Sequence, residues 1–244
     1  MTNYFQPTCI DLTSSDNLDL SHVSVTSFVV KPVSIQRVRS FIEKWHYSNN
    51  VNGLNISLVF GLFYKNQLIG AIVYGSLAMA NTWKKYGKKE SEVVELKRLC
   101  CIDKTKKNTE SFFIAKTIKF IKKYTKYKTI ISYADPFHNH QGTIYKASNF
   151  EFKGLTSKGK VIKFKDKIYH DKAIRSVDNK KKVKPFALEL IKAINEKQAI
   201  YLNTPEKHIF CYEIKRKSKT ITSLMFQKTN HNQLSVFESY ATAS

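Results

Sequence analysis

The sequence predicts an α/β protein (an α+β mixed sheet) in which a central mixed sheet carries helices on both faces. Two observations lead to this fold class. β-rich runs alternate along the chain with amphipathic segments of helical period, and hydrophobic residues make up 42% of the 244 residues. The expected order of elements is α-ββ-β-α-β-α-ββ-α-β, because a mixed sheet between helices buries the apolar face of each element.

The first elements are predicted from periodicity and from end signals. Apolar residues at helical spacing behind Ser34, a typical N-cap, indicate a helix. Two β-rich runs around Lys65-Asn66-Gln67 indicate a hairpin, and another alternating run indicates a strand. These elements are a helix over 34–46, strands over 57–64 and 68–74, and a strand over 92–102.

The second half of the chain repeats these signals. A segment with apolar residues on one side and lysines on the other indicates a helix, and a short buried strand ends at Asp135-Pro136. The expected elements are a helix over 110–124, a strand over 129–134, a helix over 142–149, a hairpin over 150–170, a helix over 185–197 and a strand over 207–215.

Net charge gives the first indication of function. The chain has 41 Lys and Arg against 19 Asp and Glu, a formal net charge of +22. Segment 84–128 has 15 basic against 5 acidic residues and segment 151–184 has 12 against 4, whereas residues 1–30 contain three aspartates and no Lys or Arg. Such a charge predicts a polyanionic partner, and we expect nucleic acid rather than a membrane because no apolar run approaches the ~20 residues of a span.

No internal repeat and no Gly/Pro-rich linker interrupts the chain. We therefore expect one domain over 31–215, preceded by an acidic, loosely ordered segment at 1–30 and followed by a tail at 216–244 to which the sequence assigns no role. The cysteines match no zinc-site spacing, and no signal peptide is recognisable, so we expect reduced thiols in a cytoplasmic protein. These cysteines are Cys9, Cys100, Cys101 and Cys211.

Arg98 is unusual in the strand predicted over 92–102. Strict alternation places it on one face with the apolar Leu96 and Cys100. A buried guanidinium needs a carboxylate partner or an anionic ligand. A structural ion pair and a role in a site are both open.

The segment before the helix at 110–124 is rich in cations and hydroxyls. Because exposed N–H groups at a helix N-terminus attract anions, Asn108, Thr109 and Ser111 could hold the phosphate groups of a cofactor. The same residues could also simply cap the helix.

Asp135 and Tyr145 are candidates for proton transfer. Asp135 follows a strand, at the edge where ligands gather in open sheets, and could accept a proton, orient an amine, pair with Arg98 or form an Asp-Pro turn. Tyr145 could donate a proton to a leaving group or fill the core. His138 and His140 could bind a metal or serve as polar surface.

His46 and Tyr47 close the first predicted helix, beside an Asn-rich loop at 49–55. A His and a Tyr in this place could contact a nucleic acid base by stacking and hydrogen bonding. They could equally be interface aromatics of the core.

Two pieces of the sequence resemble the GNAT acyltransferase fold. The segment 60–75 resembles its central hairpin, and Tyr145 to Phe150 resembles its Tyr-x-x-x-Gly-Phe signature, with Asn149 in place of the glycine. The resemblance implies that Tyr145 protonates a departing coenzyme A thiolate. The glycine-rich pyrophosphate loop of that fold is replaced by residues 105–111.

A narrower resemblance is to the Mom family of phage DNA-modification proteins. It implies a GNAT-like catalytic domain over 31–215 that converts adenine in DNA to N6-(methylcarbamoyl)adenine and so shields phage DNA from host restriction. The matching pieces follow in order: Trp45-His46-Tyr47, the hairpin, Glu95 to Leu99, Ser111 to Lys116, Tyr133 to Pro136, His140 to Ala147, and Pro205 to Tyr212.

The Mom resemblance also implies a site. Arg98, Asp135 and Tyr145 would line the reaction pocket, approached by His46 and Tyr47. Ser111, with Thr109 and Asn108, would bind acetyl-CoA or a related acyl-CoA. The resemblance also implies iron as a further cofactor, with His46, Tyr47 and Asp135 as its candidate ligands.

Double-stranded DNA is the implied partner, and the host cytoplasm is the implied location. Lys116, Lys119 and Lys123, with the lysines of 153–184, would grip the duplex without reading its sequence. Two other functions stay open. One is a GNAT-fold acetyltransferase that uses acetyl-CoA on tRNA, a protein or a small amine, and the other is a non-enzymatic DNA-binding protein that keeps the fold.

Overall fold

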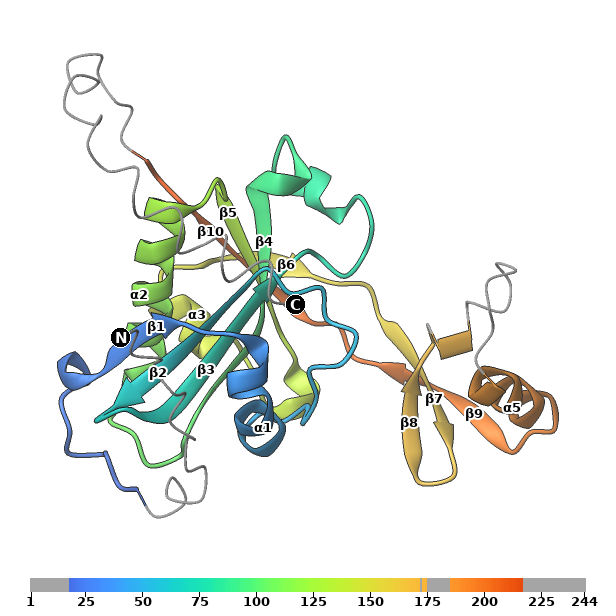
Figure 1. Cartoon of the computed structure of the whole chain (residues 1–244). Helices are drawn as coiled ribbons and strands as arrows, with labels where there is room; N and C mark the ends of the chain where they lie inside the picture. The colour runs from blue at the N-terminus through green and yellow to red at the C-terminus, as the bar shows by residue number, and fades with distance from the viewer. Residues whose placement is uncertain (1–17, 172, 175–184, 217–244) are drawn as a thin grey trace, which may run out of the picture. The chain divides into compact units, whose positions relative to one another are not determined.

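The computed structural model describes residues 18–171, 173–174 and 185–216 (Figure 1). The chain packs as two compact units. One is built from the chain up to Ser132, Ile144–Phe150 and the chain from Cys211, and the other from Tyr133–Thr143 and Glu151–Phe210. The expectation of a single domain over 31–215 stays a prediction, and residues 1–17 and 217–244, which hold most of the two terminal segments, lie outside the described part.

The larger sheet is mixed, as the sequence predicts. Its strands are β1 (Val29–Pro32), β2 (Leu58–Tyr64), β3 (Gln67–Gly75), β4 (Val93–Cys101), β5 (Thr129–Ala134), β6 (Glu151–Leu155) and β10 (His208–Glu213). They are hydrogen-bonded in the order β1-β2-β3-β4-β5-β10-β6. The pairs from β1 to β4 are antiparallel, whereas β4 and β5 are parallel.

A smaller sheet lies in the second unit, in the order β8-β7-β9. Its strands are β7 (Gly159–Phe164), β8 (Lys167–His170) and β9 (Ala199–Thr204). The helices of the described chain are α1 (Ile35–Trp45), α2 (Thr109–Tyr124), α3 (Thr143–Ala147) and α5 (Pro185–Asn195), and η5 (Pro136–His138) is a single 3-10 turn. No helix in the described ranges is both long and apolar enough to span a membrane.

Helices cover both faces of the larger sheet. Successive strand residues point to opposite faces, so Val73 and Tyr74 of β3 diverge. The Tyr74 hydroxyl lies 2.6 Å from the Thr117 hydroxyl of α2. Arg98, which pairs with Val73, instead contacts Asn50, a few residues after α1. The expectation of helices on both faces is confirmed.

The first hairpin turns at Lys65 and Asn66, whose φ angles are 45° and 67°. Two consecutive residues with positive φ form the two-residue turn that matches the twist of paired strands. Asparagine tolerates this conformation well, which explains why the chain reverses at this place.

The expected hairpin over 150–170 is wrong in its pairing. β6 joins the larger sheet beside β10, and the hairpin is formed by β7 and β8, which turn at Lys165 with φ 53°. The sequence correctly indicated strands in this segment. It did not indicate that β6 pairs with β10, which lies far along the chain. Two strands were missed: β1 is four residues long and ends at a proline, and β9 begins only four positions after the last residue of α5.

Each unit has its own apolar core. In the first unit α1 buries Val38, Phe41 and Ile42, as its helical period predicts. In the second unit Ile162 and Phe164 of β7 pack with Leu190 of α5. The thiols of Cys100, Cys101 and Cys211 are free, as expected, and Cys9 lies outside the described residues.

Candidate functional site

A β-bulge in β4 shapes the site. Val73 pairs with Arg98 while the next residue, Tyr74, pairs with Leu96, so Lys97 is the extra residue. Because Val73 and Tyr74 point to opposite faces, Leu96 and Arg98 do so too. The predicted alternation, which placed both on one face, is wrong here, since one inserted residue reverses the period beyond it.

Arg98 is held by main-chain oxygens. Its Nε donates to the Asn50 carbonyl at 3.0 Å and its Nη1 donates to the Lys97 carbonyl at 2.8 Å. Within the described residues Arg98 forms no ion pair, so the structural ion pair considered from sequence is not formed there. Burial lowers the pKa of Arg98, and the nearby Tyr47 and Glu95 act in the opposite direction.

Glu95 and Lys97 form a buried ion pair beside the bulge. The Lys97 Nζ lies 3.0 Å from a Glu95 carboxylate oxygen, and the side chains are only 4% and 12% exposed. The Lys97 stem passes over Gly75, where a Cβ would lie 2.8 Å from Lys97 Cε. Sequence reasoning missed this pair, although opposite charges two apart in a strand are a usable signal.

Tyr145 lies in α3 and is half-buried. Burial raises its pKa to about 12, and a hydrogen bond with the Ser132 hydroxyl partly opposes that shift. Ser132 also donates to the Leu96 carbonyl at 3.1 Å, at the last paired position of β4 and β5. Because its pKa lies far above neutrality, Tyr145 keeps its proton and can act as an acid.

His46 and Tyr47 form an aromatic pair just beyond α1. Their ring centroids are 4.4 Å apart with an interplanar angle of 32°. His46 is buried, and its Nδ1 lies 2.8 Å from the Ser48 hydroxyl, while Tyr47 is 44% exposed. Tyr47 is near enough to influence the pKa values of both Arg98 and Tyr145. The structure thus brings Arg98, Tyr145 and Tyr47 together in one unit.

The start of α2 differs from an ordinary cap. Asn108 is the N-cap residue, but it is left-handed at φ 73° and its side chain makes no cap hydrogen bond. The Thr109 hydroxyl donates to the Lys106 carbonyl at 2.6 Å, and the Ser111 hydroxyl donates to the Asn108 carbonyl at 3.0 Å. These hydroxyls therefore act as donors, and do not cap the N–H groups of the first turn.

Asp135 lies in the second unit. Its carboxylate accepts from the Phe137 N–H at 3.1 Å, which begins η5, and forms an ion pair with Lys207 at 2.8 Å. The Asp-Pro turn considered from sequence is therefore present. Its placement beside Arg98 and Tyr145 stays a prediction. Sequence reasoning did not identify Lys207, which lies 72 positions further along the chain.

The candidate metal ligands contact other side chains. Within the described ranges no three His, Cys, Asp or Glu residues form a group that could hold an ion. The Nδ1 of His46 contacts Ser48 and the Oδ2 of Asp135 contacts Lys207. His138 ends η5 and His140 lies two residues beyond it, and both are exposed. Within each unit taken by itself, the described donors do not fit an iron centre.

The lysines of α2 form an exposed row, as predicted. Lys116, Lys119 and Lys123 face away from the buried side of the helix. The Lys116 ammonium lies 5.1 Å from the Phe112 ring, and the Lys123 ammonium lies 4.8 Å from the Tyr124 ring. At these distances each exposed ammonium makes a cation–π contact with its neighbouring ring.

The geometry defines a class of protein: a mixed α/β fold in which a tyrosine with a raised pKa lies beside a bulged strand. The model of the Mom protein family matches residues 27–232, and the chain belongs to this family. It is 30% identical over 129 residues to the methylcarbamoylase mom of Escherichia phage Mu, covering 51% of this chain. The matched part spans 53% of the length of that relative.

Solved acetyltransferases are similar in structure. The ribosomal-protein-S18-alanine N-acetyltransferase from Escherichia coli is 9% identical with a TM-score of 0.43, covering 80% of this chain and 98% of that one. A GNAT family acetyltransferase from Elizabethkingia anophelis with acetyl-CoA bound is 12% identical with a TM-score of 0.38, covering 77% and 98%.

Proposed function

We propose that this chain is an enzyme that modifies adenine in double-stranded DNA, forming N6-(methylcarbamoyl)adenine and protecting phage DNA from restriction. The family and the phage Mu relative support the reaction class. The structural observation that carries the proposal is Tyr145, whose half-buried phenol keeps a proton beside Ser132. The net charge of +22 supports a polyanionic substrate.

We propose acetyl-CoA or a related acyl-CoA as the donor. The start of α2 fits its phosphate groups, because the helix is 16 residues long and no N-cap side chain occupies its N-terminus. Ser111 lies in this first turn, and Lys104, Lys106 and Lys107 precede it as exposed cations. When bound, the cofactor would supply the acyl carbons and a thiolate leaving group, and the carbamoyl nitrogen would come from a separate nitrogen donor.

The roles of this chain's own residues follow from their protonation and position. Tyr145 would donate the proton that a leaving thiolate requires. Asp135 is proposed to accept the proton that the adenine amino group loses. Lys116, Lys119 and Lys123 would hold the DNA backbone, so binding weakens as salt rises.

Nucleoside analysis tests the proposal. We expect DNA from cells that express the chain to contain a modified deoxyadenosine, found by mass spectrometry after digestion to nucleosides. Tyr145→Phe serves as the inactive control. Unmodified DNA in the presence of folded, expressed protein would rule the function out. Acetylation from acetyl-CoA without DNA would point to the acetyltransferase alternative, and salt-sensitive DNA binding without turnover would point to a binding protein.

A further inference from the structure

We propose that the loop after α1 presents Tyr47 as the aromatic surface on which the target adenine stacks after leaving the duplex, and that Arg98 holds this loop in place. This inference rests on the proposed function, because an enzyme that acts on a duplex base must extrude it.

Tyr47 has a fixed inner neighbour and an exposed ring. The ring lies 4.4 Å from that of His46, and His46 is only 6% exposed. The Nδ1 of His46 contacts both the Ser48 hydroxyl, at 2.8 Å, and the Ser48 N–H, at 3.1 Å. Tyr47 itself is 44% exposed. A rigid, solvent-facing aromatic ring is the usual platform for an unstacked base.

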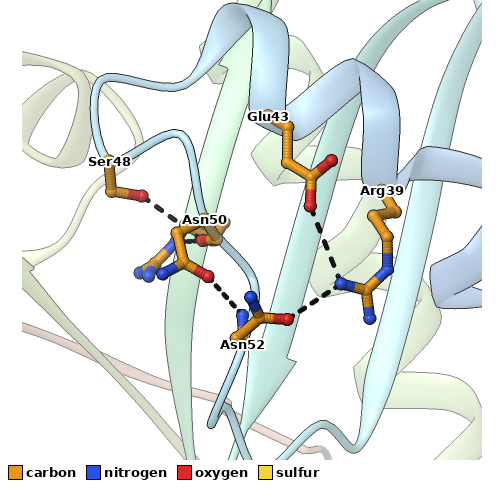
Figure 2. A network of polar contacts seen from close by, with 6 residues as sticks. Arg39, Glu43, Ser48, Asn50 and Asn52 are labelled. Carbon is orange, nitrogen blue, oxygen red and sulfur yellow. Dashed lines mark hydrogen bonds and ion pairs between the residues drawn. The ribbon is translucent and has the colours of Figure 1, made fainter. Parts of the chain in front are cut away.

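The loop that follows Tyr47 is fixed by polar contacts on both sides (Figure 2). Towards α1, Arg39 donates to the Asn52 side chain at 3.0 Å and contacts Glu43 at 3.6 Å. Within the loop, the Asn52 N–H donates to the Asn50 side chain at 2.5 Å. The Ser48 hydroxyl donates to the Asn50 carbonyl at 3.4 Å. The loop therefore has a defined shape.

Arg98 connects this loop to the bulge. Its guanidinium spans from the Asn50 carbonyl to the Lys97 carbonyl, so it joins the loop after α1 to the extra residue of β4. A planar fork with two fixed donors suits this task, and a lysine cannot reproduce it. Arg98 is thus a positioning residue for Tyr47, and Tyr145 lies in the same neighbourhood.

Duplex DNA with 2-aminopurine in place of one adenine, set in a mismatch to ease extrusion, tests the platform. Base–aromatic stacking is worth about 1–3 kcal/mol, or roughly 5- to 150-fold. With the full chain, Tyr47→Phe keeps the ring and should quench 2-aminopurine as the wild type does. Tyr47→Leu should leave the base brighter and, on matching DNA with an unsubstituted adenine, lower the modification rate at least about fivefold.

Two results would overturn the platform. One is a Tyr47→Phe variant as impaired as Tyr47→Leu, because the hydroxyl and not the ring would then matter. The other is a Tyr47→Leu variant that behaves as the wild type. If wild-type protein leaves adenine unmodified, the proposed function fails, while the fluorescence comparison still decides the role of Tyr47.

The tether to Arg98 is tested by a double variant. If Arg98 acts through the loop, Arg98→Gln should lower the rate, and Arg98→Gln with Tyr47→Leu should fall no further than the more impaired single variant. Arg98→Gln should also reduce the quenching of 2-aminopurine. Additive losses, or unchanged quenching in Arg98→Gln, would contradict a positioning role.

A different observation carries a second inference. We propose that the β7–β8 hairpin of the second unit is a ribbon that binds the phosphate backbone of double-stranded DNA, which also rests on the proposed function. Residues 158–168 contain a single acidic residue, Asp166, and five exposed lysines. The lysines are Lys158, Lys160, Lys163, Lys165 and Lys167.

The positive charges of these lysines have almost no acidic partners among the described residues. Lys165 lies 3.5 Å from Glu189, but both side chains are more than half exposed, so that pair is weak. In the part of the chain that the structure describes, the other four form no ion pair. β7 is the central strand of the sheet β8-β7-β9, and its Ile162 and Phe164 pack with Leu190 of α5, so the hairpin that carries the lysines has a fixed support. Exposed cations on such a support suit contacts with the DNA backbone, which do not depend on base sequence.

The salt dependence of DNA binding tests the ribbon. Each phosphate contact contributes about 0.9 to the slope of log K against log salt. In the full chain, Lys163→Gln with Lys167→Gln should therefore make the salt dependence less steep, with a slope smaller in magnitude by about 1.8. The affinity is measured by fluorescence anisotropy on duplex DNA without an acyl donor. The charge-matched control, Lys192→Gln with Lys197→Gln on and after α5, should leave the slope unchanged.

An unchanged slope in the hairpin variant, or an equal fall in the control, would contradict the ribbon. Loss of a dimer on sedimentation, with DNA binding retained, would instead assign the hairpin to contacts between chains and overturn the proposal. Because binding is measured without turnover, this outcome is separate from failure of the modification reaction.

Discussion

Replacing Tyr145 with phenylalanine is expected to lower the rate of adenine modification by about a hundredfold or more, the usual contribution of a general acid. The ring and its contact with Phe150, at 5.6 Å between centroids, are kept, so the fold should survive. Only the proton donor is removed. The measurement is the rate at which modified deoxyadenosine accumulates in cellular DNA after induction.

The pH dependence gives an independent check on Tyr145. Its pKa of about 12 means that the folded protein keeps the phenolic proton from neutrality well into alkaline solution. The wild-type rate should therefore show no fall between pH 7 and 9 from loss of this proton. Tyr124→Phe, which alters an exposed tyrosine of α2, should keep the wild-type rate. A Tyr145→Phe rate within twofold of the wild type would contradict the assignment.

Breaking the Glu95–Lys97 pair is expected to have the largest effect on stability. Lys97→Met leaves the Glu95 carboxylate buried without its partner, and such changes cost about 3–5 kcal/mol. Both tryptophans of the chain, Trp45 and Trp83, lie in the first unit. Tryptophan fluorescence in urea therefore reports the free energy of unfolding of the unit that contains this pair.

Two further variants complete this stability test. Glu95→Gln with Lys97→Met removes both charges and should recover most of the loss, because no unpaired charge is left buried. Glu43→Gln breaks an exposed pair with Arg39 in the same unit and should cost less than about 1 kcal/mol. If Lys97→Met costs no more than Glu43→Gln, the buried pair contributes nothing and the explanation is wrong.

Much of the fold could be predicted because its elements are determined locally. The helix predicted over 34–46 is α1, and the strand predicted over 129–134 is β5 with the same bounds. The lysine row of α2 followed from helical period alone. Strand pairing was harder to predict from the sequence, because the choice of β6 between β7 and β10 involves strands more than 50 residues apart.

The site shows the same division. Arg98, Tyr145, His46 and Tyr47 were all identified as residue types able to do chemistry, and the structure gathers Arg98, Tyr145 and Tyr47 in one unit. The direction in which Arg98 points was not predictable, because it depends on the register between β3 and β4. Its partner is the main-chain carbonyl of Asn50. Every residue has such a carbonyl, so the sequence does not indicate which one binds Arg98.

The sequence by itself determined the α/β class, the helices and most strands. It also predicted a polyanionic partner and identified Tyr145 as the candidate proton donor. Hydrophobic period, turn residues and net charge are local or additive properties, so they can be read without coordinates. Only the tertiary structure decided that Lys97 bulges, that Glu95 and Lys97 form a buried pair, and that Arg98 holds the loop that carries Tyr47. These features depend on strand register and on contacts between residues distant in the chain, which a single sequence does not specify.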